Sequence, residues 1–488
     1  MKWSGLIKLI LDDRLKEYII AKQRNSGDLL KNIQKFKHKQ EYYKIKKYLD
    51  EFIDGSNIES RFIVMPGLRG VGKSTILLQL FSYLLKEKNI DNSDILYLSM
   101  DEIVNFFDSN LLDVVDIFLD SVHKTNKMAL NKKIFIFVDE SHFDKKWAIS
   151  GKILYDNTKN IFLICAGSSA IDLEINADVA RRIYKEAIYP NNFRDHLLLK
   201  HNINVEYKFS KKLEDIIYYG EDKIIDESIA LEEKVYDKLF DLKNNPKTEF
   251  LSFLKTYGFS LTLNLNEVRA YEQTFTLINK VIENDIPSIK SFNTSTKPDI
   301  SKIINYIALS RSEMVSNTKI ANYLSLSSKL VNDILNVLEK TQIIFSIKPY
   351  AGIGKTLRKP WKYYFLSSSL KSAINFKLGR FNLENKRCLG ILAENYVAAS
   401  LFKMSKTTYP LMGLFYPPEK KGCDFLLQTK LDDIVPVEVG IGNKTKSQLV
   451  KAIIKYDCDY GVLISNRYNR IRKEKNIIHI PLLSFSFL

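Results

Sequence analysis

One eight-residue segment constrains the fold more than any other part of the chain. Residues 67–74 read Gly-Leu-Arg-Gly-Val-Gly-Lys-Ser, which satisfies the pattern G-x-x-x-x-G-K-[ST] in full. The apolar run at residues 61–65 precedes it, and residues 75–80 continue with helical spacing. Glycines at these positions let successive backbone N–H groups curve around an anion where a helix begins. The sequence therefore predicts a buried strand, a phosphate-binding loop and a helix, in that order.

The residue types in this loop indicate a nucleoside triphosphate bound with Mg²⁺. Lys73 has the position and length to reach the β- and γ-phosphates, and the Ser74 hydroxyl is a ligand for Mg²⁺. We therefore expect ATP and Mg²⁺ as cofactors. A glycine-rich turn with an incidental lysine is the weaker interpretation, because it does not account for the flanking strand and helix. The expected nucleotide-binding residues are Gly67, Leu68, Arg69, Gly70, Val71, Gly72, Lys73, Ser74 and Thr75.

Apolar runs and helical segments alternate after the loop. Residues 94–100, 133–139 and 160–166 are further runs with the length of strands, and residues 111–123 have helical periodicity between two of them. Strands that are apolar throughout are buried on both faces, and their alternation with helices is typical of a parallel sheet. We predict an α/β fold with a parallel sheet for this part of the chain.

An acidic pair ends the run at residues 133–139. Asp139 and Glu140 follow Lys73 by 66 residues, where a nucleotide-hydrolysing site needs a second carboxylate for Mg²⁺. Asp139 would hold Mg²⁺ through its water shell together with Ser74, and Glu140 would orient and deprotonate the attacking water. The alternative is an aspartate that caps the next helix, but the complete phosphate loop favours the catalytic interpretation.

A serine pair follows the run at residues 160–166. The hydroxyl of Ser168 or Ser169 would contact the γ-phosphate or the attacking water, and we take Ser168 as the candidate. The equally weighted alternative is the N-cap of a helix that begins at Ala170.

The length of 488 residues implies roughly three domains. Residues 54–57 are a turn signal and residues 291–298 a linker signal. Together with the changes in strand and helix pattern along the chain, they divide it into five parts. The expected parts are an N-terminal helical segment (1–54), a P-loop core (55–200), a helical lid (201–297), a winged helix (298–380) and a C-terminal α/β domain (381–488).

Positive charge is concentrated in the last part of the chain. Residues 301–488 hold 29 Lys and Arg against 13 Asp and Glu, so the whole chain's net charge of +16 lies there. A basic domain attracts polyanions, of which nucleic acid is the commonest, although a general abundance of lysine explains the charge equally well. No run approaches the roughly 18 apolar residues of a membrane span. The four cysteines are far apart, and neither they nor the six histidines have zinc-site spacing, so we expect a reduced, cytoplasmic protein.

A helix–turn–helix pattern lies within this basic part. Residues 318–324 and 329–338 have helical spacing around a serine-rich turn, and strand-like runs at 343–347 and 361–366 flank a basic loop at 352–360. The pattern predicts a winged helix that binds duplex DNA, or alternatively one that only packs against protein. Because residues 329–340 contain Lys329 and Lys340 but no arginine, we expect mainly backbone contacts.

A family resemblance rests on Arg181-Arg182 and on residues 189–195, Tyr-Pro-Asn-Asn-Phe-Arg-Asp. These resemble the prokaryotic AAA+-like ATPases with a C-terminal winged helix and restriction-endonuclease-like domain, which read Gly-Arg and then aliphatic-Tyr-Pro-Leu-Ser-Phe-Arg-Glu. Arg181 replaces the glycine, and Asn191-Asn192 replace Leu-Ser. The resemblance covers the chain from about residue 60 to its end. It implies that Arg182 stabilises the transferring phosphate, within the chain or in a neighbouring subunit of a homo-oligomer; a surface salt bridge is the alternative.

The last hundred residues resemble the PD-(D/E)XK nuclease core. Glu394 falls on the first helix, Asp424 on a strand and Glu438 on the next strand, which implies a metal site for phosphodiester hydrolysis. The departure is Gly440, which stands where the family has its catalytic lysine. Lys444 or Lys446 would have to replace it, and a core that has become a binding surface is the rival interpretation.

Three functional hypotheses follow. The first is a Mg²⁺-dependent ATPase coupled to a nucleic-acid-associated C-terminal half, in genome defence or mobile-element biology. The second is an ATP-gated DNA nuclease. The third is a nucleotide-switched scaffold for a protein partner.

Overall fold

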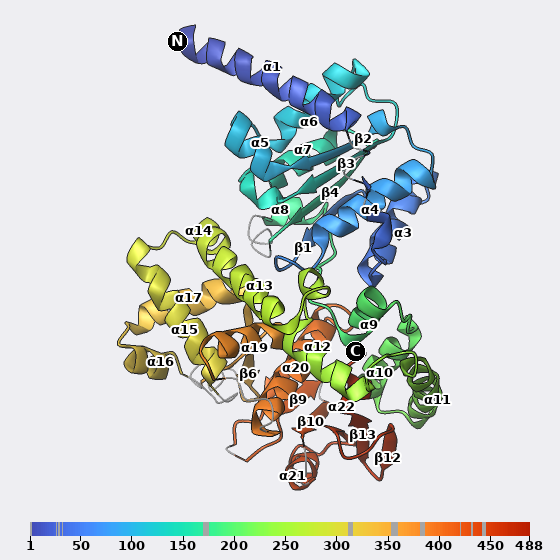
Figure 1. Cartoon of the computed structure of the whole chain (residues 1–488), viewed down its shortest axis with the longest axis vertical. Coiled ribbons are helices and arrows are strands. Elements are labelled where there is room, and N and C mark those ends of the chain that lie inside the picture. The colour runs from blue at the N-terminus through green and yellow to red at the C-terminus, as the bar shows by residue number, and fades with distance from the viewer. Residues whose placement is uncertain are drawn as a thin grey trace. The chain divides into compact units, whose positions relative to one another are not determined.

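The computed structural model describes two compact units, Met1–Tyr189 and Pro190–Leu488 (Figure 1). We call them the N-terminal and C-terminal units. The five-part division by residue range stays a prediction. None of the described helices is long and apolar enough to cross a membrane. The described residues are 2–25, 27, 30–31, 33–168, 175–310, 316–352, 360–380, 386–419, 421–430, 433–441 and 446–488.

The N-terminal unit is built on a parallel sheet, as the apolar runs predict. Its described strands lie in the order β2-β3-β4-β1-β5 and are parallel throughout. All residues of β1, β3 and β4 are buried, because helices cover both faces. The strands are β1 (Phe62–Pro66), β2 (Ile95–Ser99), β3 (Ile134–Asp139), β4 (Ile161–Gly167) and β5 (Tyr184–Lys185).

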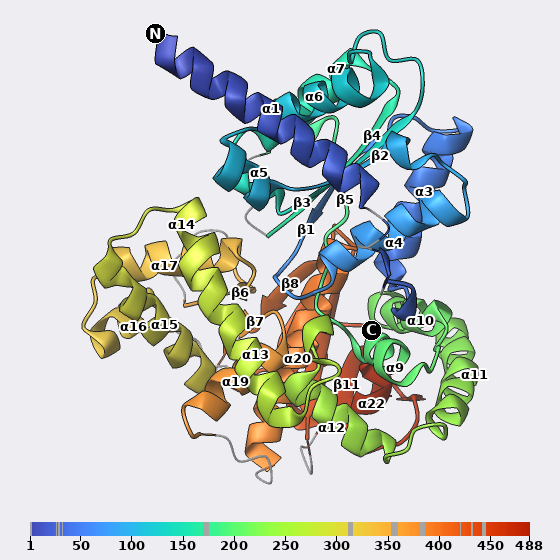
Figure 2. The same ribbon diagram turned by 45° about the horizontal axis from the view of Figure 1, so that its top comes forward.

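Two layers of helices enclose this sheet (Figure 2). One face packs its alternate strand residues, such as Val64 and Ile136, into a cluster with Phe118 and Trp147 of the covering helices. The other face presents Phe135 and Phe137, which meet Phe52 and Phe81. The first layer includes α1 (Lys2–Arg24), α5 (Met100–Phe107), α6 (Leu111–His123), α7 (Trp147–Asn157) and α8 (Ala177–Ala180), and the second includes α3 (Gln40–Asp54) and α4 (Lys73–Lys86); short turns are η1 (Ile33–Lys35), η2 (Asn92–Asp94) and η3 (Ser141–Phe143).

The C-terminal unit begins with helices. These are α9 (Phe193–His201), α10 (Tyr207–Tyr219), α11 (Asp222–Leu239), α12 (Pro246–Thr256), η5 (Ser260–Thr262), α13 (Glu267–Lys280), η6 (Val281–Asp285), α14 (Ile286–Ile289), η7 (Thr294–Thr296), α15 (Lys297–Leu309), α16 (Asn317–Leu324) and α17 (Ser328–Lys340). Helix α9 starts with a capping box, in which the side chains of Asn192 and Asp195 each accept from the other's backbone N–H.

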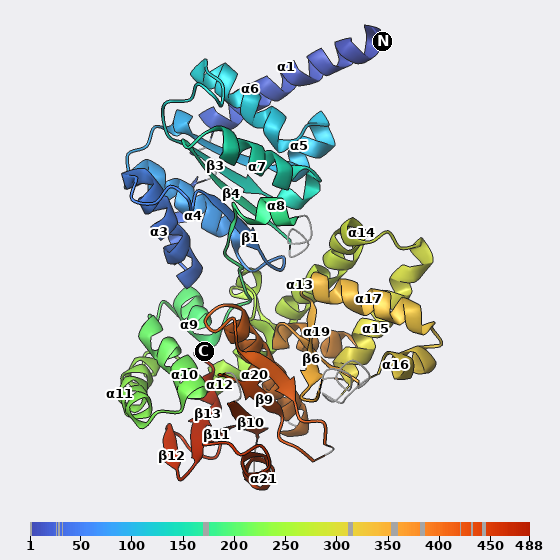
Figure 3. The same ribbon diagram turned by 180° about the vertical axis from the view of Figure 1, so that it is seen from behind.

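An eight-stranded described sheet follows, in the order β12-β13-β11-β10-β9-β8-β6-β7. Strands β8, β9 and β10 are antiparallel neighbours, and β11 is parallel to β10. The strands are β6 (Ile344–Pro349), β7 (Lys362–Phe365), β8 (Gly413–Tyr416), β9 (Phe425–Gln428), β10 (Ile434–Gly440), β11 (Gly461–Ser465), β12 (Arg472–Glu474) and β13 (Ile477–Pro481), and the accompanying helices are α19 (Ser368–Lys377), α20 (Lys386–Lys406), α21 (Ser447–Lys455) and α22 (Leu482–Phe485). Figure 3 shows the strands from β9 onward in orange and red beside α20 and α21.

Helices α16 and α17 and the hairpin β6–β7 fall on the residues where the sequence pattern predicts two helices and two strands, and their assignment as a winged helix stays a prediction. The hairpin is continuous with the C-terminal sheet, because β6 pairs with β8 in parallel register at Lys348↔Phe415 and Pro349↔Tyr416. The Asn395 amide on α20 also exchanges hydrogen bonds with the backbone N–H and C=O of Phe365, at 3.0 and 2.8 Å. The hairpin and the strands of the last hundred residues therefore share one sheet. Most of the basic loop at 352–360 lies outside the described residues.

Candidate functional site

The phosphate loop connects β1 to α4 and needs its glycines for two separate reasons. Gly70 and Gly72 have φ of 77° and 104°, in the left-handed region that other residues rarely adopt. A Cβ on Gly67 would lie 2.4 Å from the Ile188 carbonyl oxygen. The backbone beyond β5 runs beside β1 up to this point, with the Ile188 N–H donating to the Pro66 carbonyl at 2.8 Å.

Lys73 is the first residue of α4 and is almost fully buried. Its ammonium donates to the carbonyl oxygens of Gly67, at 2.9 Å, and Leu68, at 3.0 Å, so the side chain folds back over the loop. Ser74 is exposed beside it. A helix N-terminus, left-handed glycines, a lysine over the loop and an open hydroxyl fit a Mg²⁺-bound triphosphate.

A second buried lysine, which no sequence motif indicates, lies behind the loop. Lys39 precedes α3 and is 4% exposed. Its ammonium donates to the carbonyl oxygens of Tyr189, at 3.1 Å, and Val71, at 3.5 Å. Lys39 therefore connects the loop to the last residue of the N-terminal unit.

Asp139 and Glu140 lie at the same edge of the sheet as the phosphate loop. Strands β3 and β1 flank β4 in parallel, so their carboxyl ends meet at one edge. Asp139 is 5% exposed and accepts from the Tyr97 hydroxyl at 3.1 Å. Burial, and then the Asp139 charge, raises the pKa of Tyr97, which stays a hydrogen-bond donor. Glu140 has φ of 49°, and its N–H donates to Asp139 Oδ1 at 2.9 Å.

The side chain of Glu140 meets the phosphate loop through Arg69. Arg69 Nη1 lies 3.3 Å from Glu140 Oε1, and Arg69 Nη2 lies 3.4 Å from His142 Nε2. His142 Nδ1 lies 3.5 Å from Glu140 Oε2. Burial, followed by the charges of Arg69 and Lys73, lowers the pKa of His142 to about 3, so this imidazole is neutral. His142 belongs to no motif recognised in the sequence, although its position two residues after an acidic pair is a usable signal.

Ser168 follows β4 at this edge and is buried. Its N–H lies 3.3 Å from His142 Nδ1. Ser169 and the helix expected from Ala170 lie outside the described residues, so the sensor and cap roles of Ser168 both stay predictions.

Arg182 pairs with acidic residues in the part of its own chain that the structure describes. Its Nε lies 2.5 Å from Asp156 Oδ1, and its Nη1 lies 2.6 Å from the Asp178 carbonyl oxygen and 3.3 Å from Asp178 Oδ1. The geometry matches the salt-bridge alternative within one chain, and the phosphate-stabilising role remains untested.

Comparison with known proteins agrees with the site. Residues 59–197 match the family model described as "AAA domain", so this segment is an AAA-type P-loop ATPase domain, as the motifs and the resemblance predict. Residues 263–384 match a model described as a domain of unknown function, DUF8612. The uncharacterized protein MJ1637 of Methanocaldococcus jannaschii is 30% identical over 477 residues, which cover 97% of this chain and 94% of that protein. The chain belongs to the MJ1637 family.

Solved structures resemble this MJ1637-family chain only distantly. The ORC1 protein of Aeropyrum pernix, solved in complex with DNA, is 11% identical with a TM-score of 0.30 over 69% of this chain and 92% of that one. AMPPCP-bound DnaA from Aquifex aeolicus is 14% identical with a TM-score of 0.25 over 61% and 87%. Likenesses this weak add nothing to the assignment.

Two carboxylates of the predicted nuclease-like site have separate hydrogen-bond partners in the MJ1637-family chain, and the third is buried. Glu394 on α20 accepts from the Tyr364 hydroxyl at 2.9 Å, and Asp424 Oδ2 accepts from the Val439 N–H at 2.7 Å. Glu438 is fully buried in β10, which ends at Gly440. Of the expected replacements for the missing lysine, Lys446 pairs with Glu474, and Lys444 lies outside the described residues.

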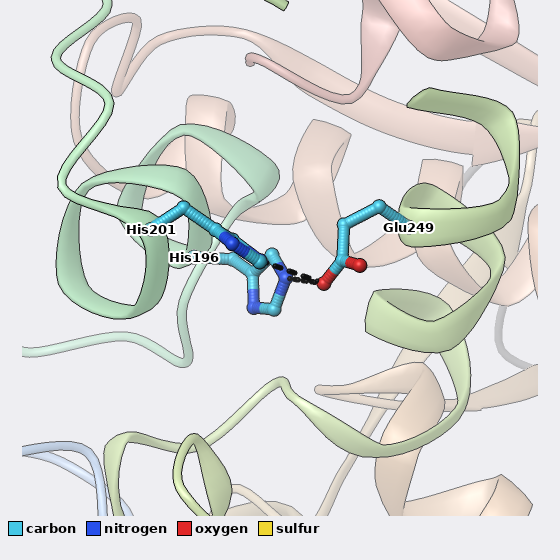
Figure 4. A group of neighbouring side chains, drawn as sticks. All are labelled: His196, His201 and Glu249. Atoms are coloured by element: carbon cyan, nitrogen blue, oxygen red, sulfur yellow. Dashed lines mark hydrogen bonds and ion pairs between the residues drawn. The ribbon is translucent and has the colours of Figure 1, made fainter. Parts of the chain in front are cut away.

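Two histidines and a glutamate converge elsewhere in the C-terminal unit (Figure 4). Of the side chains that the structure describes, His196, His201 and Glu249 form the one group of three metal-ligating residues whose ligand atoms lie within 4.8 Å of one another. Both imidazole Nε2 atoms lie 2.8 Å from Glu249 Oε1. The Lys200 ammonium lies 3.2 Å from the same oxygen, and the Asn244 amide donates to Oε2. Because Lys200 neutralises the Glu249 carboxylate and four donors surround it, this carboxylate is satisfied without a metal ion.

This network makes the stability of the C-terminal unit sensitive to acid. Burial lowers the pKa of His196 from 6.5 to about 4. Burial alone would raise the pKa of Glu249, but hydrogen bonds from His196, His201 and Asn244 and the Lys200 charge outweigh it and hold that pKa below its usual range. The unfolded chain therefore binds more protons than the folded one below pH 6.5.

We expect the free energy of unfolding of the C-terminal unit to fall by about 3 kcal/mol between pH 6.5 and pH 4, from His196 alone. Glu249 continues the loss at lower pH. Hydrogen exchange of α9 and α12 at several pH values measures it. His196→Gln keeps a donor but does not titrate, so it should flatten the dependence; equal protection at pH 7 and pH 4.5 in the unsubstituted protein would contradict the prediction.

Proposed function

We propose that this chain is a Mg²⁺-dependent ATPase whose C-terminal unit binds nucleic acid, mainly through the DNA backbone. One observation supports the ATPase part of this proposal. The complete phosphate loop lies at the same edge of the sheet as Asp139 and Glu140, and Arg69 Nη1 of the loop is 3.3 Å from Glu140 Oε1. Hydrolysis at a phosphate loop needs one acidic group for the metal ion and one group that positions the attacking water, and two consecutive carboxylates at this edge suit these two tasks.

Each residue has a distinct task in this proposal. Lys73 exchanges the carbonyls of Gly67 and Leu68 for the β- and γ-phosphates. Ser74, and Asp139 through the water shell, would hold Mg²⁺, which when bound would supply positive charge to the phosphate oxygens. Glu140 accepts a proton from the attacking water.

Two further residues complete the proposed machinery. Ser168 offers its hydroxyl to the γ-phosphate or to the water. Arg182 pairs with Asp156 and Asp178 in its own chain, so its proposed action on transferring phosphate, within the chain or in a second copy in a homo-oligomer, would require it to leave these ion pairs.

The charge of the C-terminal part and helix α17 support nucleic-acid binding. The buried face of α17 packs Val331, Ile334 and Leu338. The solvent-facing residues are Ser328, Lys329, Asn332, Asn336 and Lys340. Two lysines and two amides suit phosphate contacts with few base contacts.

Turnover of ATP should therefore rise when duplex DNA is added, and binding should weaken steeply with salt. Each phosphate contact that is neutralised contributes a slope of about −0.9 to log K against log [salt]. Fluorescence anisotropy at 50 to 300 mM salt, with wild type and with Lys329→Glu/Lys340→Glu, measures that slope. ATP turnover that ignores DNA and RNA, together with salt-independent binding, would contradict the proposal.

The second candidate function is the ATP-gated nuclease. It is favoured by one observation, the succession of α20, three antiparallel strands, α21 and the parallel strand β11, with Glu394 on the helix and Asp424 and Glu438 at β9 and β10. Gly440 stands against activity, because no lysine follows Glu438 at the position that would stabilise developing charge. We therefore propose that this fold serves as a binding surface for DNA or a protein partner. The same DNA incubated with ATP and Mg²⁺ or Mn²⁺ should remain uncut.

A further inference from the structure

The Arg69 side chain belongs to the phosphate loop but is engaged with the catalytic carboxylate. Its guanidinium spans Glu140 Oε1, at 3.3 Å, and His142 Nε2, at 3.4 Å. His142 in turn lies 3.5 Å from Glu140 Oε2. Arg69 and His142 thus flank Glu140 from two sides.

This arrangement differs from an ordinary surface ion pair in its burial. The side chains of Arg69 and Glu140 are 19% and 25% exposed, and that of His142 is 4% exposed. Charge pairs that are partly removed from water interact more strongly than exposed pairs. Glu140 also lies in the left-handed region, with φ of 49° and ψ of 38°. A glutamate adopts this region at some cost in free energy, so the backbone that carries the carboxylate is strained.

Arg69 is itself a residue of the loop whose backbone would surround the phosphates. Its neighbour Gly70 is one of the left-handed glycines of the loop. A phosphate group carries more charge than a carboxylate and presents two oxygens that match the guanidinium fork. A γ-phosphate beside the loop would therefore compete with Glu140 for Arg69. A nucleoside diphosphate has no γ-phosphate and would not compete.

We propose that Arg69 is a positioning residue that holds Glu140 while no γ-phosphate is bound and exchanges Glu140 for the γ-phosphate when a nucleoside triphosphate arrives. The exchange leaves Glu140 free to accept a proton from water only when there is a phosphate to transfer. This inference rests on the proposed ATPase function and adds discrimination between triphosphate and diphosphate.

A double-mutant cycle with the non-hydrolysable analogue AMPPCP tests the exchange. Glu140→Gln removes the charge that competes for Arg69, so AMPPCP should bind roughly five-fold more tightly than to wild type. The gain should disappear in the Arg69→Ala background. Arg69→Ala alone should weaken AMPPCP and leave ADP affinity within about two-fold, and Arg69→Lys should recover part of the difference because it keeps the charge but not the fork.

Two outcomes overturn the inference. One is a loss of ADP and AMPPCP affinity by the same factor in Arg69→Ala, which would mean that the side chain only supports the loop. The other is a change in AMPPCP affinity on Glu140→Gln that is the same in the wild-type and Arg69→Ala backgrounds. Failure of the ATPase proposal looks different, since wild type would then neither bind AMPPCP nor hydrolyse ATP, and Lys73→Ala would change nothing.

Discussion

Glu140→Gln should lower the turnover of ATP by at least about 100-fold while ATP still binds. A positioned general base contributes about 10²- to 10⁴-fold to a rate, and glutamine keeps the shape of glutamate without its basicity. Lys73→Ala should instead abolish binding, because the ammonium that lies 2.9 Å from the Gly67 carbonyl oxygen is the group available to the phosphates. Steady-state turnover and equilibrium binding of ATP separate the two effects.

Asp120→Asn is the matched control for Glu140→Gln. It removes one carboxylate from the same unit, but Asp120 is an exposed residue of α6. Turnover should stay at the wild-type value. Hydrolysis by Glu140→Gln at a wild-type rate would remove Glu140 from the catalytic role and leave the acidic pair with a structural one.

Phe193→Ala should have the largest effect on stability, about 3 to 5 kcal/mol of unfolding free energy in the C-terminal unit. Phe193 is fully buried at the start of α9, and its ring centroid lies 5.4 to 5.5 Å from those of Phe250, Phe253 and Phe487. Its truncation would leave a cavity between α9, α12 and the residues after α22. Phe193→Leu keeps an apolar side chain and should lower the free energy of unfolding by less.

Hydrogen exchange followed by peptide locates this loss. Protection should fall in α9, α12 and α22 and remain in β1, β3 and β4. Trp147→Ala is the converse variant, since Trp147 is fully buried in the core of the N-terminal unit, and its loss of protection should stay there. If either variant lowers protection equally in both units, the two do not unfold separately.

Much of the N-terminal unit could be predicted from local pattern. The runs at 133–139 and 160–166 are apolar at every position, and such runs are buried in parallel strands whatever their neighbours. The C-terminal unit was harder, because its strands are short and its pairings are distant. No local signal indicates that β6 pairs with β8 across Lys348↔Phe415, which joins the hairpin to the later sheet.

The candidate site shows the same division. Lys73, Ser74, Asp139 and Glu140 were predictable because phosphate and Mg²⁺ chemistry fixes both their types and their places beside strands. Lys39 and His142 were not predicted, since each functions through a contact with the phosphate loop or its partners. His196, His201 and Glu249 likewise have no zinc-site spacing, and Lys200 makes their convergence an ion-pair network.

The sequence by itself determined the kind of chemistry and the parallel α/β core, because an eight-residue loop and a run of buried strands are encoded locally. Only the tertiary structure decided what the side chains around that loop do to one another. The 3.3 Å contact between Arg69 and Glu140 joins residues 71 positions apart. It exists because β1 and β3 end at the same edge of one sheet, a consequence of strand order that no local segment specifies.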